Sequence, residues 1–272
     1  MNPIKQRVLA GECVTAAWAE MGSPDNAEAM AMNGWPVIVI DGEHGIGDLE
    51  RAVHIARAVE AAGGQAVMRV PDGSETTLKR VLDRGIRSII VPQVNTPDYA
   101  RAIAEYCTYP VRGRRGYAAP IVRASRYGAQ ADYAIRAHDD LLLMVQIEHH
   151  VAVDNLAEIA AVPGIDVLFV GPNDLAASID RLERMLEPEP QALLKRIEAG
   201  AAKAGKPLGT IVGAGRDFVD LARLGYRFII GPNDVSLIVN GARQAAADRD
   251  RQLASVRPAQ ETDAIPVHRS AY

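Results

Sequence analysis

The stretch from Leu141 to Ser178 constrains the fold of this chain more than any other. It contains two apolar runs rich in β-branched residues, LLLMVQIE and IDVLFV, with a helix predicted over Val151–Ala161 between them. This order predicts a strand–helix–strand unit, and strands this apolar suit a parallel sheet that is buried on both faces. The residues that follow the two strands are therefore expected at the same end of the sheet.

Carboxylate side chains follow both strands of this unit. Gln146 and Glu148 end the first strand two residues apart, so their side chains point to the same face. The second strand ends in GPND, which brings Asp174 to the same end of the sheet. Two carboxylates held there predict a site for a hard divalent cation.

The same alternation of apolar strand and helix continues through the rest of the chain. Further strands are predicted at Cys13–Ala17, Trp35–Ile40, Gln65–Val70, Arg87–Val91, Leu208–Val212 and Tyr226–Ile230. Further helices are predicted at Ser23–Met32, Asp48–Ala62, Glu75–Arg84, Pro97–Tyr106, Ala131–Ala137, Pro188–Ala204, Asp217–Leu224 and Val235–Leu253. Eight strands alternating with helices predict a single-domain (β/α)8 TIM barrel over residues 1–254. The tail, residues 255–272, is expected to be disordered or to lie at a subunit interface.

An open, doubly wound sheet is the structural alternative, but no GxGxxG motif follows the first strand. The net charge of −4 gives no electrostatic case for binding nucleic acid or an anionic membrane. Cys13 and Cys107 match no metal or redox spacing and suit reduced thiols. With no signal peptide or membrane-spanning stretch at hand, we expect a soluble, cytoplasmic protein.

Polar residues gather at the carboxyl ends of the predicted strands, where barrel enzymes place their active sites. These residues are Asp41, Glu43, His44, Arg69, Gln93, Gln146, Glu148 and Asp174. A single Asp after a strand more often caps a helix than binds a metal, so the signal is their convergence. GPND occurs a second time at Gly231–Asp234, and by spacing alone either Asp174 or Asp234 could be the second metal ligand.

Seven motifs together resemble the metal-dependent (class II) pyruvate aldolases. They are VIVIDGEHG from Val37, MRVP from Met68, LKRVLDRG from Leu78, IIVPQVNT from Ile89, RGRRGYAAPIVRASRYG from Arg112, VQIE from Val145 and VGPNDLAAS from Val170. That family includes 2-dehydro-3-deoxyglucarate aldolase and 2,4-dihydroxyhept-2-ene-1,7-dioate aldolase. The resemblance runs in order from about residue 10 to residue 245.

The resemblance implies a barrel that exchanges its last helix between subunits, commonly as dimers arranged in a hexamer. It implies Mg²⁺, Mn²⁺ or Co²⁺ bound by Glu148 and Asp174, with pyruvate chelating the ion. Arg69 would polarise the keto oxygen, Gln146 would orient it, and His44 paired with Asp41 would transfer protons, with indirect support from Asp83. The loop Gly171, Pro172, Asn173 and Asp174 is expected to bind substrate.

The predicted reaction is reversible aldol cleavage of a 4-hydroxy-2-oxo acid, such as a 2-keto-3-deoxy sugar acid, to pyruvate and an aldehyde. A Schiff-base mechanism is not favoured, because none of the strand-end residues is Lys. Oxaloacetate decarboxylation or acyl-CoA cleavage on the same metal platform is the alternative, and a non-catalytic binding protein is a third reading.

The sequence leaves the roles of two segments open. The Arg-rich loop from Tyr109 to Gly128, which holds Arg112–Arg126, could form solvated or intersubunit ion pairs, or Arg114 or Arg123 could neutralise a distal carboxylate on the aldehyde. His149 and His150 follow Glu148, where the resembled family commonly has Thr. We expect them to be helix-start residues rather than ligands.

Overall fold

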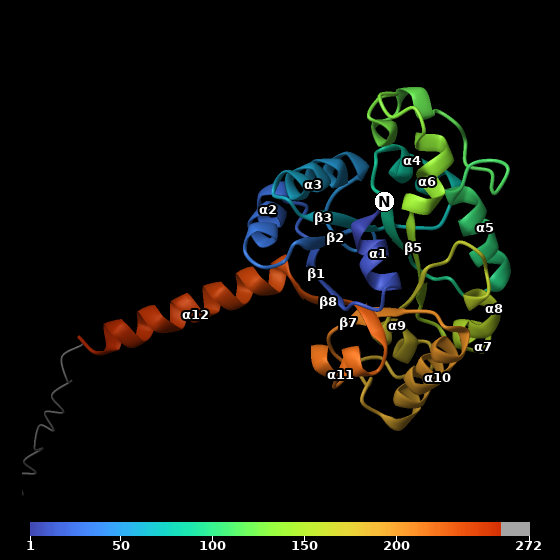
Figure 1. Cartoon of the computed structure of the whole chain (residues 1–272). Coiled ribbons are helices and arrows are strands. Elements are labelled where there is room, and N and C mark those ends of the chain that lie inside the picture. The colour runs from blue at the N-terminus through green and yellow to red at the C-terminus, as the bar shows by residue number, and fades with distance from the viewer. Residues whose placement is uncertain (257–272) are drawn as a thin grey trace, which may run out of the picture. The chain divides into compact units, whose positions relative to one another are not determined.

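The structure, a computed structural model, describes residues 1–256, and the predicted tail lies outside these apart from its first two residues. The described residues divide into two units, residues 1–235 and residues from 236 onwards. The first unit contains eight parallel strands that close into a barrel, each paired with its neighbours in sequence and β8 paired with β1 (Figure 1). The strands are β1 Val14–Ala19, β2 Val37–Asp41, β3 Gln65–Arg69, β4 Ser88–Val91, β5 Leu142–Ile147, β6 Val167–Val170, β7 Leu208–Ile211 and β8 Tyr226–Asn233. The predicted barrel is therefore confirmed.

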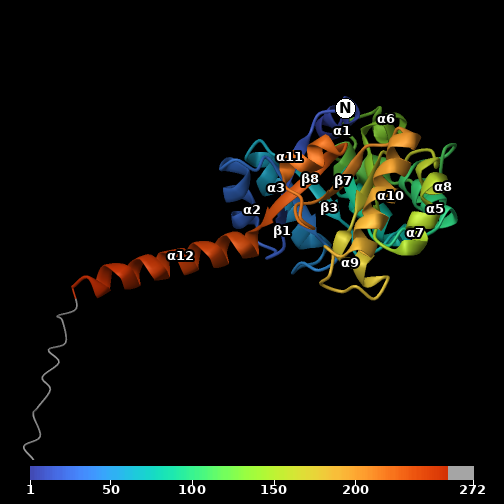
Figure 2. The same ribbon diagram turned by 90° about the horizontal axis from the view of Figure 1, so that it is seen from below.

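Helices surround this ring of strands, as the view in Figure 2 shows. They are α1 Pro3–Leu9, α2 Pro24–Met32, α3 Leu49–Ala61, α4 Glu75–Asp83, α5 Pro97–Cys107, α6 Tyr133–Asp140, α7 His150–Asp154, α8 Leu156–Ala160, α9 Pro172–Ala177, α10 Pro188–Ala204 and α11 Phe218–Arg223. The long helix α12, Asp234–Ala254, leads into the second unit. Within the part of the chain that the structure describes, no helix combines the length and apolar character needed to cross a membrane.

Three local features differ from the sequence prediction. The helix predicted over Val151–Ala161 is split into α7 and α8 at Asn155. The Asn155 side chain donates to the Asn95 carbonyl (2.9 Å) at this break. The Arg-rich loop contains two short 3-10 turns, η1 Ala119–Ile121 and η2 Arg123–Ser125. Strand β8 continues to Asn233 rather than ending at Ile230, because it pairs with β1 beyond an irregularity in the register.

The strands are apolar on both faces because both faces are buried. In β2 the side chains of Val37 and Val39 belong to the cluster inside the barrel, whereas Ile38 and Ile40 belong to the layer between the strands and the helices. This period of two explains why the strand sequences show almost no polar residue before their carboxyl ends.

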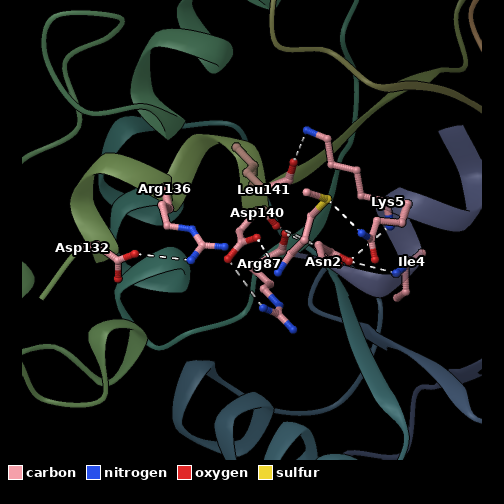
Figure 3. A network of polar contacts seen from close by, with 11 residues as sticks. Asn2, Ile4, Lys5, Arg87, Asp132, Arg136, Asp140 and Leu141 are labelled. Carbon is pink, nitrogen blue, oxygen red and sulfur yellow. Dashed lines mark hydrogen bonds and ion pairs between the residues drawn. The ribbon is translucent and has the colours of Figure 1, made fainter. Parts of the chain in front are cut away.

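Helix α1, which the sequence analysis did not predict, closes the amino end of the barrel. Its Ile4 and Val8 side chains join the interior cluster. Asn2 caps the helix by accepting from the Ile4 and Lys5 amides (3.0 and 3.2 Å), and its Nδ2 donates to the Ser88 hydroxyl (2.8 Å) (Figure 3). Lys5 Nζ donates to the Leu141 carbonyl (2.7 Å). With this end closed, the opening at the carboxyl ends of the strands is the one that can hold a site.

Candidate metal and substrate site

A cavity of about 360 Å³ opens at the carboxyl ends of the barrel strands. Its lining combines residues that end or follow seven of the eight strands: Trp18, Glu20, His44, Arg69, Gln146, Phe169, Gly171, Pro172, Asn173, Asp174, Ile211, Val212, Gly231 and Asn233. A larger hollow of about 550 Å³ lies beside α5 and the end of α6, away from the strand-end carboxylates. Of the eight strand-end residues that the sequence analysis brought together, four line the smaller cavity: His44, Arg69, Gln146 and Asp174. The other four contact this group, since Asp41 and Glu43 pair with Arg69, Glu148 accepts from Gln146, and the Gln93 amide donates to Glu148.

Arg69 is the fixed positive charge of this cavity. Its Nε and Nη2 donate to the two carboxylate oxygens of Asp41 (2.9 and 2.6 Å), and its Nη1 lies 3.0 Å from Glu43 Oε2. The guanidinium also lies over the ring of Trp18, 4.7 Å from its centroid. Burial opposes the ionisation of Asp41, but the hydrogen bonds and charge of Arg69 outweigh it, so the pKa of Asp41 lies below its ordinary value. The pair is thus ionised at neutral pH and holds the guanidinium in one orientation.

Glu148, which follows β5, is a buried carboxylate, with 2% of the residue exposed. One oxygen accepts from the Gln93 amide (2.8 Å), and the other accepts from Gln146 Nε2. Gln93 adopts a left-handed backbone conformation (φ 57°) to make this contact. The pKa of Glu148 is raised to about 7, chiefly by burial and in part by the nearby charge of Asp174, while the hydrogen bonds from Gln93 and Gln146 act in the opposite direction. A cation at this position would reverse that penalty.

The residues around Glu148 fit a divalent cation. Gly171 lies so close that a β-carbon there would be 2.6 Å from Glu148 Oε2, so the glycine leaves open space beside the carboxylate. Asp174, in the first turn of α9, lines the same cavity. Gln146 Oε1 is buried, and among the described residues it has no hydrogen-bond partner. Since no third His, Cys, Asp or Glu joins a ligand group in residues 1–256, substrate and water would complete an oxygen-rich coordination shell.

The structure distinguishes the two GPND motifs. Asp234 is buried, and its Oδ1 accepts from the Glu20 and Val235 amides (2.9 and 3.0 Å) while its Oδ2 accepts from the Met21 amide (3.1 Å). Both oxygens of Asp234 are thus occupied by backbone donors. Asp174 instead faces the cavity that Gln146 and Gly171 line. Asp174 is therefore the better placed of the two carboxylates to bind a metal with Glu148.

His44 lies at the mouth of the cavity, but its ring does not pair with Asp41 as we had expected. Asp41 Oδ1 accepts from the backbone amides of Glu43 and His44 (3.1 and 3.3 Å) and from Arg69 Nε, and its Oδ2 accepts from Arg69 Nη2, so the contacts of this carboxylate go to other groups than the His44 ring. The His44 ring is 69% exposed and lies nearest to Glu43, with 3.9 Å between Nε2 and Oε2. The acid that can orient this imidazole is therefore Glu43.

Asp83 lies away from the cavity. It ends α4, which leads into the start of β4, so it lies towards the amino end of the barrel. Its Oδ1 is 2.7 Å from Nη2 of Arg115, a buried guanidinium that also packs over the ring of Tyr109. In the chain as described, Asp83 therefore anchors the Arg-rich loop, and no contact carries its expected support of the site.

The two arginines considered for a distal carboxylate also lie elsewhere. Arg114 Nε lies 3.5 Å from Glu105 Oε2 near the end of α5, and Arg123 Nη2 lies 2.7 Å from Glu60 Oε2 near the end of α3. Neither residue lines the cavity. These ion pairs lie within one chain, so solvated or intersubunit contacts of the loop and recognition of a distal carboxylate both stay predictions.

His149 and His150 begin α7, as expected. His149 Nδ1 accepts from the Val151 amide (3.2 Å) and so caps the helix. The His150 amide donates to the Ser178 hydroxyl (3.0 Å), and its Nδ1 lies 2.9 Å from the Ser178 carbonyl. Both rings are thus engaged in local structure.

Sequence reasoning missed Trp18 and Glu20 as cavity residues. The first strand was predicted to end at Ala17, whereas β1 continues to Ala19 and places both residues at the cavity. The apolar wall formed by Phe169, Ile211 and Val212 was also missed, because apolar residues at strand ends carry no signal that separates them from the core.

Comparisons with known proteins agree with this geometry. The family described as HpcH/HpaI aldolase/citrate lyase matches residues 15–241. A hydroxypyruvate/pyruvate aldolase of Cupriavidus necator is 38% identical over 249 residues, which cover 90% of this chain and 91% of that protein. A 2-keto-3-deoxy-L-rhamnonate aldolase of Shigella sonnei is 37% identical over 76% of this chain and 78% of its own length. The crystal structure of a HpcH/HpaI aldolase/citrate lyase family protein from Burkholderia cenocepacia J2315 is 34% identical, with a TM-score of 0.86 over 92% of this chain and 100% of that chain.

Proposed function

This chain belongs to the HpcH/HpaI aldolase/citrate lyase family, and we propose that it cleaves a 4-hydroxy-2-oxo acid reversibly to pyruvate and an aldehyde. The observation that carries the proposal is the presence of opposite charges at one cavity. Arg69, a buried guanidinium, lines the cavity, and the buried carboxylate of Glu148 accepts from Gln146, which lines it too. This arrangement suits a substrate that bears a carboxylate and develops negative charge on a neighbouring oxygen.

We propose that Glu148 and Asp174 hold a divalent cation, of which Mg²⁺, Mn²⁺ and Co²⁺ suit two carboxylates best. Such an ion, when bound, supplies Lewis-acid polarisation of the 2-oxo group and a template for the substrate carboxylate. The short helix α9 begins beside it, so Gly171, Pro172 and Asn173 form the wall against which the substrate would lie. Gln146, beside Gly171, would orient the substrate.

Cleavage requires the C4 hydroxyl to lose its proton while the C3–C4 bonding electrons move into the 2-oxo group. Arg69 would stabilise the developing oxyanion, because Asp41 and Glu43 hold its guanidinium rigidly and it keeps its charge at working pH. His44 would take the hydroxyl proton as the aldehyde leaves, with Glu43 beside its ring. The proton then returns to C3, which yields pyruvate.

The assembly of the protein is part of the proposal. We propose a cytoplasmic homo-oligomer, with dimers arranged as a hexamer, in which α12 is exchanged between subunits. Residues 1–254 would then be the aldolase barrel and residues 255–272 its tail. Mass measurement of the native complex and cross-linking through cysteines introduced on α12 would test this arrangement.

Solvent exchange at the pyruvate methyl group tests the proposed reaction directly. The protein is incubated with pyruvate and Mg²⁺ or Mn²⁺ in D₂O, and the methyl protons are followed by NMR beside a chelator-treated sample. We expect metal-dependent loss of the methyl signal, and Glu148→Gln should abolish it. No exchange with any of these metals would refute an aldolase that accepts free pyruvate, and oxaloacetate decarboxylation or acyl-CoA cleavage would then be examined.

A further inference from the structure

Glu20 is a carboxylate of the cavity that the proposed reaction does not use. It follows β1 directly, and its side chain lines the cavity together with Trp18, His44 and Arg69. Among residues 1–256, its carboxylate makes no hydrogen bond or ion pair, although the side chain is only partly exposed. A carboxylate kept beside a substrate cavity without a protein partner is available to interact with a ligand.

Three hydrogen bonds fix the backbone at Glu20 and Met21. Its amide donates to Asp234 Oδ1 (2.9 Å), and the next amide, that of Met21, donates to Asp234 Oδ2 (3.1 Å). Its carbonyl accepts from the Ile46 amide (2.8 Å). Because these contacts link the loop after β1 to the loops after β2 and β8, the position from which the Glu20 side chain enters the cavity is set by the barrel itself.

The electrostatic setting of the cavity is acidic. The carboxylates of Glu20, Asp41, Glu43, Glu148 and Asp174 surround or approach it, and Arg69 is the one Lys or Arg side chain among the residues that line it. Arg69 is already paired with Asp41 and Glu43. Even with a divalent cation bound, the mouth of the cavity therefore stays negative towards an incoming aldehyde. Arg114 and Arg123, which could have offset this charge, pair with acids near the ends of other helices.

We propose that Glu20 selects the aldehyde partner: it accepts hydrogen bonds from hydroxyl groups of a neutral hydroxy-aldehyde and repels an aldehyde that carries its own carboxylate. This inference rests on the proposed aldolase function and names the substrate class of that site. A hydroxyl that donates to a carboxylate gains a charge-assisted hydrogen bond, whereas a second carboxylate meets a like charge in a partly desolvated cavity. In this role, the Glu20 side chain would contact the part of the substrate beyond C4.

The test compares pairs of aldehydes of equal chain length that differ in one kind of group. Condensation with pyruvate is followed for propanal against glyceraldehyde, which adds hydroxyls, and for butanal against 4-oxobutanoate, which adds a carboxylate. The wild-type protein should favour glyceraldehyde over propanal and butanal over 4-oxobutanoate in kcat/KM. In Glu20→Gln, we expect the discrimination against 4-oxobutanoate to fall on the order of tenfold, because one like charge is removed at close range. Glu28→Gln, a partly exposed residue of α2 outside the cavity, is the matched control and should leave both ratios unchanged.

The wild-type protein provides a second measurement that does not depend on the variant folding. Raising the salt concentration from about 10 mM to about 500 mM should narrow the gap between butanal and 4-oxobutanoate, since screening weakens repulsion between partly exposed charges. A gap that salt and Glu20→Gln both leave unchanged, in a protein that does exchange the pyruvate methyl protons, would overturn the role of Glu20 alone. Absence of that exchange would overturn the proposed function, and the inference with it.

Discussion

The substitution Gly171→Ala tests the predicted metal site without removing any charged group. Gly171 precedes α9 with φ −100°, a conformation that alanine adopts freely, so the substitution introduces no backbone strain. The added methyl carbon would lie 2.6 Å from Glu148 Oε2, and 2.9 Å from both Gln146 Nε2 and Glu148 Cβ. The carboxylate must therefore move by several tenths of an ångström at least, although the Gln93 amide holds its other oxygen.

The size of the effect follows from this crowding. Overpacking of this kind costs about 1–3 kcal/mol of unfolding free energy. Displacing a ligand or its supporting contacts lowers metal affinity about 10- to 100-fold, which corresponds to about 1.4–2.8 kcal/mol. We therefore expect Gly171→Ala to remain folded while its affinity for Mn²⁺ falls by at least tenfold.

Titration calorimetry or Mn²⁺ electron paramagnetic resonance measures this affinity, and circular dichroism confirms folding. Gly241→Ala in α12 is the matched control, because a β-carbon there meets no atom within 4 Å, and its Mn²⁺ affinity should equal that of the wild type. A Gly171→Ala protein that binds Mn²⁺ as tightly as the wild type would refute the argument that Glu148 holds the ion in the position the structure gives it.

Three further predictions concern the charged groups. The metal-free protein should lose stability as the pH rises from about 5 to above 7, because the folded state binds the Glu148 proton more tightly than the unfolded state does (pKa about 7, against an ordinary 4.5). The full loss of unfolding free energy is on the order of 3 kcal/mol, and urea unfolding of Glu148→Gln should show a weaker dependence of stability on pH. Asp174→Asn should weaken metal binding at least tenfold with little change in stability, whereas Asp234→Asn should keep metal affinity and lose about 1–2 kcal/mol in the same unfolding assay, since it caps three backbone amides. Arg69→Ala should cost about 3–5 kcal/mol as well as turnover, because it leaves the buried Asp41 carboxylate unpaired, while Arg69→Lys should lose turnover with a smaller loss of stability; equal unfolding curves for the two variants would contradict this.

The barrel could be predicted from the sequence because its signal is repeated in every strand. A strand buried on both faces must be apolar at each position, as Val37–Ile40 illustrates, and eight such runs alternating with helices leave few topologies open. Helix α1 was missed for the opposite reason. Its seven residues are too short to show a helical period, and its main signal is the Asn2 cap followed by Pro3.

The residues of the candidate site could be predicted from the sequence where they lie at the carboxyl ends of strands. Strand direction alone brings Arg69, Gln146, Glu148 and Asp174 to one end of the barrel, and the structure brings them around one cavity and its buried edge. Which side chains pair there depends on rotamers and on distances between strands, and these leave no pattern in the sequence. The Asp41 carboxylate was therefore expected beside the His44 ring, three residues away, but it pairs with a residue of the next strand.

The two GPND motifs show where such reasoning reaches its limit. Each follows an apolar run, and in each the Asp lies in the first turn of a helix, so local sequence assigns them the same role. What differs is the neighbouring strand. Asp174 follows β6, beside the end of β5 with its buried carboxylate Glu148, and that neighbour favours a shared cation. Asp234 follows β8, beside the end of β1, where the free backbone amides of Glu20 and Met21 satisfy its charge. The proposed metal ligand and the residue that links the ends of β8 and β1 thus share one four-residue motif, and the group on the neighbouring strand decides which role the Asp takes.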